Sequence, residues 1–343
     1  MLAGCHALAA VSLAEVLPMF LDTLTALPRD PAVAWLFPGQ GAQHPGMGSD
    51  LYAESAAARE VFDRADAALG VPLSRICFEG DEAELTRTVN AQPALVAHGL
   101  AALAAAVEAG SVRERPAFLA GHSLGEYAAL VAAGALPLEE GLRLVRERGR
   151  LMQDACDAEP GTMAAIVALE REQVDEICAA HGATMCNENA PGNVSIGGSP
   201  AAVEAAGEAA KAAGGRVFPL AVAGAFHTSL MASAEAGMRE ALADARFADP
   251  DPPVISNVTA RPLTKASELA SELADQITNS VRWADSVLAM AEAGVTRLVE
   301  FGPGKTLTGA ARRTVRGVGV RNVATAADAR AGVPSAAVES GAR

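Results

Sequence analysis

A buried strand, a sharp turn and a helix follow one another between residues 117 and 133, and no other stretch restricts the fold as much. The apolar run 117–120 predicts a strand, and the alanine-rich run 126–133 predicts a helix. Between them Gly121-x-Ser123-x-Gly125 has the spacing of a nucleophile elbow, which holds one side chain exposed at a tight turn. Glycine is expected at both flanking positions because a Cβ there would collide with the adjacent strand and helix. The segment predicts an α/β fold with Ser123 as a candidate nucleophile.

The position of Ser123 supports a catalytic interpretation over an ordinary turn. A G-x-S-x-G match alone arises often by chance, but here a predicted strand precedes it and a predicted helix follows. The serine would then lie at a helix N-terminus, where free N–H groups and the helix dipole favour developing negative charge.

Composition excludes several classes of partner and site. A chain of 343 residues, half of them hydrophobic, can form one large domain or one domain with a smaller insertion. The net charge of −14, with no basic stripe, argues against nucleic acid. No run approaches 18 apolar residues, so we expect no membrane span. Five scattered cysteines without a C-x-x-C pair indicate reduced thiols of a cytoplasmic protein and predict neither a disulfide framework nor a metal site.

The first part of the chain predicts an N-terminal extension and then the parent domain. Residues 1–28 are expected to form an amphipathic helical extension. A buried strand at 32–37 leads into the glycine-rich loop Pro38-Gly39-Gln40-Gly41, whose small residues would let backbone N–H groups face a ligand oxygen. Further helices are predicted at 51–69, at 91–110 (with Pro93 near its first turn) and at 138–156.

The middle of the chain has a different pattern, in which strand-like and helical runs alternate in the order β-α-β-β-α-β. This is the order of the split ferredoxin-like unit. The runs lie at 163–169, 171–181, 184–188, 193–196, 200–213 and 216–222. Buried strands at 254–258 and 295–301 then resume the parent domain. The predicted organisation is an extension (1–31), a large α/β subdomain (32–160 and 222–325), an inserted small subdomain (161–221) and a disordered tail (326–343).

Two glycine-rich segments resemble nucleotide-binding loops but lack required residues. In Gly302-Pro303-Gly304-Lys305-Thr306 the first glycine of a phosphate loop is replaced by Val299. The Gly39-x-Gly41 pair lacks the third glycine of a dinucleotide loop. We therefore expect no nucleotide cofactor.

Five motifs in order resemble a known family. They are Phe37-Pro38-Gly39-Gln40-Gly41, Gly121-His122-Ser123-Leu124-Gly125-Glu126, Gly224-Ala225-Phe226-His227, Asn257-Val258 and Glu300-Phe301-Gly302-Pro303-Gly304. Together they resemble the malonyl-CoA:acyl carrier protein transacylases and the acyltransferases of polyketide synthases, over about residues 32–315. The resemblance implies an α/β-hydrolase-like large subdomain with a parallel sheet and an inserted ferredoxin-like subdomain.

The resemblance also implies a mechanism, with a Ser–His pair and no cofactor. Ser123 would attack the thioester of malonyl-CoA and pass malonyl, through a seryl ester, to the phosphopantetheine thiol of an acyl carrier protein. His227 would be the general base, oriented by the backbone carbonyl of Gln276. The backbone N–H groups of Gln40 and Leu124 would form the oxyanion hole.

Four further positions match residues that bind substrate in the family. Arg148 lies 25 positions after Ser123, where the family carries the arginine that pairs with the malonyl carboxylate. Phe226 matches malonyl-type members and would occupy the space that an α-methyl group needs. Gln92 and Asn189 align with polar residues of the pocket, although either could instead bond local backbone.

Two other functions stay open at this point. A thioester hydrolase could use the same Ser–His pair, although α/β-hydrolases usually place the histidine close to the chain end. A docking scaffold without chemistry would have no need of Ser123, His227 and Arg148 together. A carrier protein is acidic, as is this chain, so docking would need a local basic patch. The candidates are Lys211, Arg216, Arg312, Arg313 and Arg316.

Overall fold

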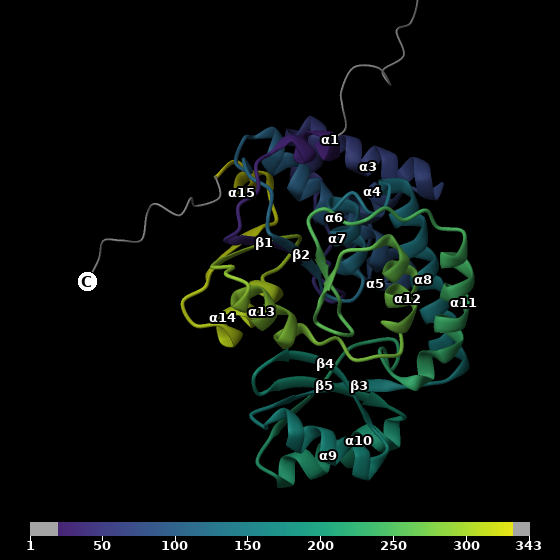
Figure 1. The fold of residues 1–343 in the computed structure, drawn as a ribbon. Coiled ribbons are helices and arrows are strands. Elements are labelled where there is room, and N and C mark those ends of the chain that lie inside the picture. The colour runs from purple at the N-terminus through teal and green to yellow at the C-terminus, as the bar shows by residue number, and fades with distance from the viewer. Residues whose placement is uncertain (1–19, 332–343) are drawn as a thin grey trace, which may run out of the picture.

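The computed structural model describes residues 20–331 and contains two separate sheets (Figure 1). The larger sheet has the order β10-β9-β1-β2-β7-β8, and all of its neighbouring strands are parallel except the β7–β8 pair. Its strands are β1 (Val33–Phe37), β2 (Phe118–Gly121), β7 (Val254–Ile255), β8 (Pro262–Leu263), β9 (Arg297–Phe301) and β10 (Gly319–Val323).

Helices cover both faces of the larger sheet. The residues of β1 alternate: Val33, Trp35 and Phe37 belong to one core cluster, whereas Ala34 and Leu36 belong to another. The first cluster is completed by α1 (Phe20–Ala26), α2 (Ser49–Glu54), α3 (Ala56–Leu69), α4 (Leu73–Glu79), α5 (Glu82–Thr86), α6 (Thr88–Glu108), α7 (Gly125–Ala132), α8 (Leu138–Ala158), α11 (Ala232–Ala243), α12 (Ala266–Asp275) and α15 (Ala326–Arg330). The second is completed by α13 (Trp283–Glu292) and α14 (Thr306–Thr314). A sheet buried on both faces has little need of polar residues along its strands.

Helix α6 runs through the core. It is the one helix in the described range with the length and mean hydropathy of a membrane span, and 94% of the qualifying window is buried inside the protein. It is therefore a core helix. Its mean hydropathy reaches that of a membrane span even though polar residues such as Asn90, Gln92 and His98 interrupt its apolar run. It also begins earlier than predicted, so Pro93 lies inside the helix, and the amide of Asn90 donates to the Glu84 carbonyl at 2.9 Å.

The predicted helix 51–69 is divided into α2 and α3. Ser55 has an extended backbone, and its hydroxyl accepts a hydrogen bond from the backbone N–H of Ala58 at 3.0 Å. A serine that caps the following helix in this way ends the preceding one, which is the physical reason for the break.

The smaller sheet has the order β4-β5-β3-β6 and is antiparallel throughout. Its elements are β3 (Thr162–Val167), α9 (Arg171–His181), β4 (Thr184–Ala190), β5 (Asn193–Gly198), α10 (Pro200–Ala212) and β6 (Arg216–Pro219). This is the predicted β-α-β-β-α-β order. Figure 1 shows α9 and α10 on the face of this sheet that is turned away from the rest of the molecule. The expected mixed α/β fold with a parallel-rich sheet and an added antiparallel sheet is confirmed, while the exact domain boundaries stay a prediction.

Strand β4 joins the smaller sheet to the large part of the molecule. The backbone N–H of Glu188 donates to the Val281 carbonyl, and the N–H of Val281 donates to the Cys186 carbonyl, both at 2.9 Å. Arg171 forms ion pairs with Glu188 at 2.6 Å and with Asp285 at 3.1 Å. These contacts fix the smaller sheet against α13 and so fix one wall of the site described below.

The chain termini depart in part from expectation. Leu24 of α1 is buried in the core, and residues 1–19 of the predicted extension lie outside the described residues. The expected disorder from residue 326 is wrong for α15, because Ala326 and Ala329 are buried and Thr325 and Asp328 form a capping box. Small side chains here pack closely, where composition alone indicated disorder. Residues 332–343 are outside the described range.

Candidate active site

Ser123 lies on a turn that only glycine can flank. The backbone of Ser123 has φ 53°, in the left-handed region that non-glycine residues avoid. A Cβ on Gly121 would lie 1.9 Å from the carbonyl carbon of Gly125, and one on Gly125 would lie 2.3 Å from the Phe37 carbonyl oxygen. The predicted steric reason for both glycines is present. The turn joins β2 to α7 and leaves the serine side chain facing a pocket.

Asn257 holds the two ends of this turn together. Its Oδ1 accepts from the backbone N–H of Ser123, and its Nδ2 donates to the Gly121 carbonyl, each at 2.7 Å. Both hydrogen bonds are buried and therefore strong supports for a strained backbone. Asn257 follows β7 and lies within a motif of the resemblance, but the sequence did not indicate this clamping contact.

His227 is within hydrogen-bonding distance of the serine hydroxyl. Its Nε2 lies 2.9 Å from Ser123 Oγ, and its Nδ1 lies 2.7 Å from the Gln276 backbone carbonyl. A carbonyl can only accept, so Nδ1 carries the proton and Nε2 is free to accept one. Burial, followed by the positive charge of Arg148, lowers the pKa of His227 to about 3. The imidazole is therefore neutral near pH 7 and has the form that a general base needs.

Arg148 is buried beside the pair and does not belong to the solvated face of α8. Only 1% of it is exposed, whereas Arg143 and Arg150 of the same helix are on its outer face. Its Nη1 donates to Gln92 Oε1 at 2.8 Å, and its Nη2 donates to Ser123 Oγ and to Gln276 Oε1, each at 2.9 Å. The structure thus brings three other predicted residues, Gln92, Ser123 and Gln276, around the guanidinium of Arg148.

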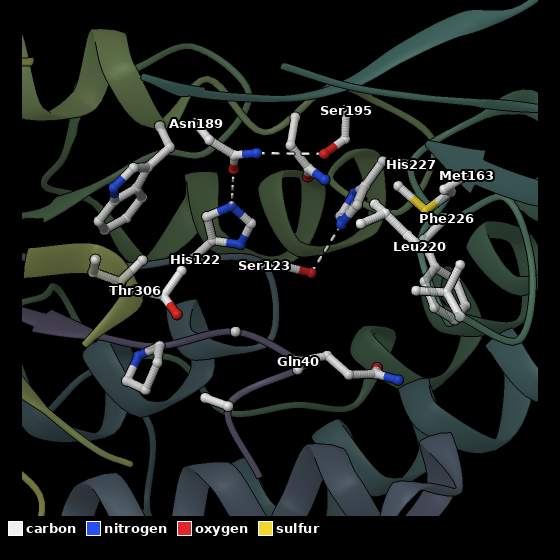
Figure 2. Close-up of a pocket in the computed structure, with 18 of the residues that line it drawn as sticks. Gln40, His122, Ser123, Met163, Asn189, Ser195, Leu220, Phe226, His227 and Thr306 are labelled. Atoms are coloured by element: carbon white, nitrogen blue, oxygen red, sulfur yellow. Dashed lines mark hydrogen bonds between the residues drawn. The ribbon is translucent and has the colours of Figure 1, made fainter. Parts of the chain in front are cut away.

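Ser123, His227 and Arg148 line a pocket of about 410 Å³, a size suited to a small ligand (Figure 2). Asn189 of β4 forms one wall, where its Oδ1 is 3.1 Å from His122 Nε2 and its Nδ2 donates to Ser195 Oγ at 3.3 Å. Figure 2 shows Phe226 with Met163 and Leu220 at an apolar end of the pocket. His122, Met163 and Ser195 were not predicted as site residues. The hydrogen bonds from His122 through Asn189 to Ser195 connect the two sheets, and a single sequence does not reveal such contacts.

Gln40 lies on the other side of Ser123 from His227 in Figure 2. Within residues 20–331, the backbone N–H groups of Gln40 and Leu124 donate to no protein acceptor. An N–H group without a partner beside a nucleophile can donate to an oxyanion. The site can therefore supply a nucleophile, a neutral base, two oxyanion donors and a fixed cation.

Metal ligation has no support in the described residues, which contain no group of three His, Cys, Asp or Glu side chains arranged to hold an ion. The four cysteines in the described range are free and buried. Cys5 lies outside it.

The basic residues proposed for docking fall into two groups: Arg312, Arg313 and Arg316 lie in or just after α14, whereas Lys211 and Arg216 lie on α10 and β6 beside the smaller sheet. Arg313 of α14 is exposed and lines the pocket rim. Lys211 lies on α10, on the far face of the smaller sheet, and pairs with Glu208 at 2.8 Å. Arg313 is thus the candidate that can meet a partner entering the pocket.

Comparisons with known proteins agree with this geometry. The acyl transferase domain family matches residues 34–335. The chain is 43% identical over 290 residues to the malonyl CoA-acyl carrier protein transacylase of Bacillus subtilis strain 168, covering 83% of this chain and 90% of that protein.

Solved structures give the same result. The acyl-carrier-protein S-malonyltransferase of Bartonella henselae aligns with a TM-score of 0.83 at 40% identity, over 88% of this chain and 98% of that one. A malonyl-transacylase solved in complex with its type II polyketide synthase acyl-carrier protein aligns with a TM-score of 0.83 at 38% identity, over 87% of this chain and 97% of that one.

Proposed function

The chain belongs to the acyl transferase domain family, and on this premise we propose that it moves malonyl from malonyl-CoA to the phosphopantetheine thiol of an acyl carrier protein. The observation that carries the proposal is the Ser123–His227 hydrogen bond of 2.9 Å beside the buried guanidinium of Arg148. The first two groups supply acyl transfer through a seryl ester, and the third supplies selectivity for an acyl group that ends in a carboxylate.

In the first half-reaction Ser123 Oγ attacks the thioester carbonyl carbon while its proton passes to His227 Nε2. The carbonyl oxygen becomes an oxyanion, which the N–H groups of Gln40 and Leu124 stabilise. The C–S bond then breaks, and the departing sulfur takes the proton from His227. The products are malonyl-Ser123 and free CoA.

The second half-reaction runs the same steps in reverse with a different thiol. The carrier-protein thiol gives its proton to His227 and attacks the ester carbonyl, and the C–O bond to Ser123 breaks as the oxygen regains that proton. A neutral carbonyl as the partner of His227 Nδ1 suits this cycle, because the ring needs to hold the proton only until the leaving group departs.

Arg148 provides the selectivity. Its buried fork of N–H groups can bind a carboxylate with two parallel hydrogen bonds. An acyl group without a carboxylate would leave the guanidinium buried without its ligand, at a cost in binding. Gln92 and Gln276 hold the guanidinium in place from two sides.

The thioester hydrolase is the less favoured reading. The family relatives are transacylases, and a general hydrolase has no use for a buried arginine beside the nucleophile. We also propose that the protein acts in the cytoplasm, which the buried free thiols support.

Intact-mass measurement tests the proposal. Incubation with malonyl-CoA should add the mass of one malonyl ester to the wild type and nothing to S123A. Addition of phosphopantetheinylated carrier protein should then remove the ester and transfer the same mass to the carrier. Loss of the ester to water at an equal rate with and without carrier would contradict a transferase and favour the hydrolase.

A further inference from the structure

Among the residues that the structure describes, no carboxylate is in direct contact with the buried cation Arg148. Its three hydrogen bonds in the described structure go to two amide oxygens and one hydroxyl, and none of these carries a charge. A fully buried guanidinium without a counterion is costly. The carboxylate that acts on it is Glu126, which is fully buried on α7.

Gln276 joins the two charged side chains, and its amide can face only one way. Arg148 can only donate, so Gln276 Oε1 must face it, at 2.9 Å. The Ser123 carbonyl can only accept, so Gln276 Nε2 must face it, at 3.1 Å. The same Nε2 donates to Glu126 Oε2. This orientation leaves Glu126 Oε2 as an acceptor.

The other carboxyl oxygen, Glu126 Oε1, is also an unfavourable position for a proton. Glu126 Oε1 is buried and has no hydrogen-bond partner among the described residues. A proton on Oε2 would oppose the Gln276 donor, and a proton on Oε1 would be a buried donor without an acceptor. The hydrogen-bond pattern therefore favours the ionised form while the cation has no other partner.

We propose that Glu126 is the counterion of Arg148 in the empty site, connected to it through the Gln276 amide, and that it takes up one proton when the malonyl carboxylate binds Arg148. This inference rests on the proposed malonyl specificity. With the substrate bound, Arg148 has a carboxylate of its own, and an ionised Glu126 would leave a net negative charge in a buried site. The proton comes from solvent, and it returns to solvent when malonyl leaves for the carrier thiol.

The groups around Glu126 are poised for such a change. Burial raises the pKa of Glu126 well above 4.5, and the nearby carboxyl of Glu272 on α12 raises it further. The hydrogen bonds from the Gln276 amide and the Asn257 backbone N–H, and the charge of Arg148 on α8, act in the opposite direction, and the net shift of this pKa is upward. The remaining neighbour is the Tyr127 hydroxyl, whose pKa burial raises, so that it stays neutral. When a substrate carboxylate neutralises the charge of Arg148, the pKa of Glu126 should rise further and favour the protonated acid.

The sign of the pH effect follows from linkage. Binding that takes up a proton weakens as pH rises through the range in which free Glu126 is ionised, by about tenfold in Kd per pH unit at the limit. The pKa of His227 is about 3 and that of His122 is lowered to about 4, chiefly by burial, so neither ring titrates between pH 6 and 9.

Calorimetry can count the proton. S123A should bind malonyl-CoA without reacting, and titrations in buffers of different ionisation enthalpy at pH 6 to 9 give the protons exchanged. We expect uptake to rise toward one proton with increasing pH, and to be absent from S123A/E126Q, whose glutamine can still accept from Gln276. Acetyl-CoA, which lacks the carboxylate, corrects for titration of the CoA phosphates. Equal proton counts for the two variants across the whole range would overturn the proposal.

An infrared measurement keeps the test valid if E126Q fails to fold. In the wild type labelled with ¹³C-glutamate, loading with malonyl should produce a carboxylic-acid carbonyl band that carries the isotope shift. Absence of such a band from protein that intact mass shows to be fully malonylated would also overturn it. A wild type that forms no malonyl ester at all would instead refute the proposed function.

Discussion

The ring of His227 is held by a backbone carbonyl, that of Gln276, at 2.7 Å from Nδ1. A carboxylate in this place would raise the pKa of the imidazole, whereas burial and the nearby Arg148 lower it to about 3. The same residue uses its side chain to hold Arg148. Gln276 therefore fixes the base through its backbone and the cation through its amide.

This relationship predicts the acid side of the pH profile. Because the pKa of His227 is about 3, the ring stays neutral down to about pH 4. The kcat/KM for malonyl loading should show no fall between pH 7 and pH 5, provided that the fold survives. Stopped-flow measurement of CoA release gives the profile, with far-UV circular dichroism as the control. An acid limb centred near pH 6.5 would mean that His227 titrates as an exposed histidine does.

Replacement of Arg148 should change which acyl group is accepted. In R148A the malonyl carboxylate loses its buried partner, and kcat/KM for malonyl-CoA should fall by about 10²–10³-fold. The kcat/KM for acetyl-CoA should fall much less, so the malonyl-to-acetyl ratio of kcat/KM should decrease strongly. The matched control is R143A on the outer face of the same helix, where the side chain donates to the Ala68 carbonyl and lies away from the pocket. A similar fall in kcat/KM for both acyl groups would show that Arg148 acts on Ser123 and does not bind the malonyl carboxylate.

The elbow should not tolerate any side chain at Gly121. In G121A the new Cβ would lie 1.9 Å from backbone of the following helix, so backbone must shift, at a cost of about 3 kcal/mol of unfolding free energy. Serine reactivity toward a fluorophosphonate probe should be lost as well. The control is G309A in α14, where a Cβ meets nothing within 4 Å and should stabilise the helix by about 0.5–1 kcal/mol. Chemical denaturation compares the two, and equal stabilities would contradict the steric argument.

The sequence predicted most of the secondary structure because the signals are local. The strand, the glycine spacing and the helix of the elbow lie within 17 residues, and the six elements of the smaller sheet each have their own apolar pattern. It did not predict the edge strands β8 and β10 or the helices α4, α5, α12, α13, α14 and α15. Each of these has ten residues or fewer, and such short elements depend on packing against the rest of the fold. It placed Pro93 too near a helix start, since the buried turn before it has no start signal.

The sequence predicted which residues form the site but not all of the contacts between them. Ser123, His227 and Arg148 were identified from sequence, but the contact between Ser123 and His227 joins elements 104 residues apart in the chain. Asn257 and Glu126 also stand in motifs, and nothing in their neighbourhood of sequence shows that they face Ser123 and Gln276. Side-chain contacts of this kind are set by tertiary packing.

Phe226 should limit the size of the substituent that the acyl group can carry on its α-carbon. Only 6% of Phe226 is exposed and it lines the pocket, so F226S should make space for an α-methyl group. We expect the methylmalonyl-to-malonyl ratio of kcat/KM to rise by about 10–200-fold, the value of one methyl contact. F218S is a suitable control, because Phe218 on the edge strand β6 is 50% exposed. An unchanged acyl ratio in F226S would place the α-carbon elsewhere in the pocket.

Arg313 should assist the carrier protein more than the small substrate. It lies exposed at the pocket rim on a chain with a net charge of −14, where it offers a local attraction to an acidic partner. In R313E the rate of transfer to carrier protein should fall on the order of tenfold at low salt, and the defect should shrink as salt is added. Loading of Ser123 from malonyl-CoA should change much less. K211E, at an ion pair on the far face of the smaller sheet, should leave both steps unchanged. An equal fall in loading and transfer for R313E would show that this arginine contacts CoA. A defect of the same size in K211E would show that net charge, and not a residue at the pocket rim, governs docking.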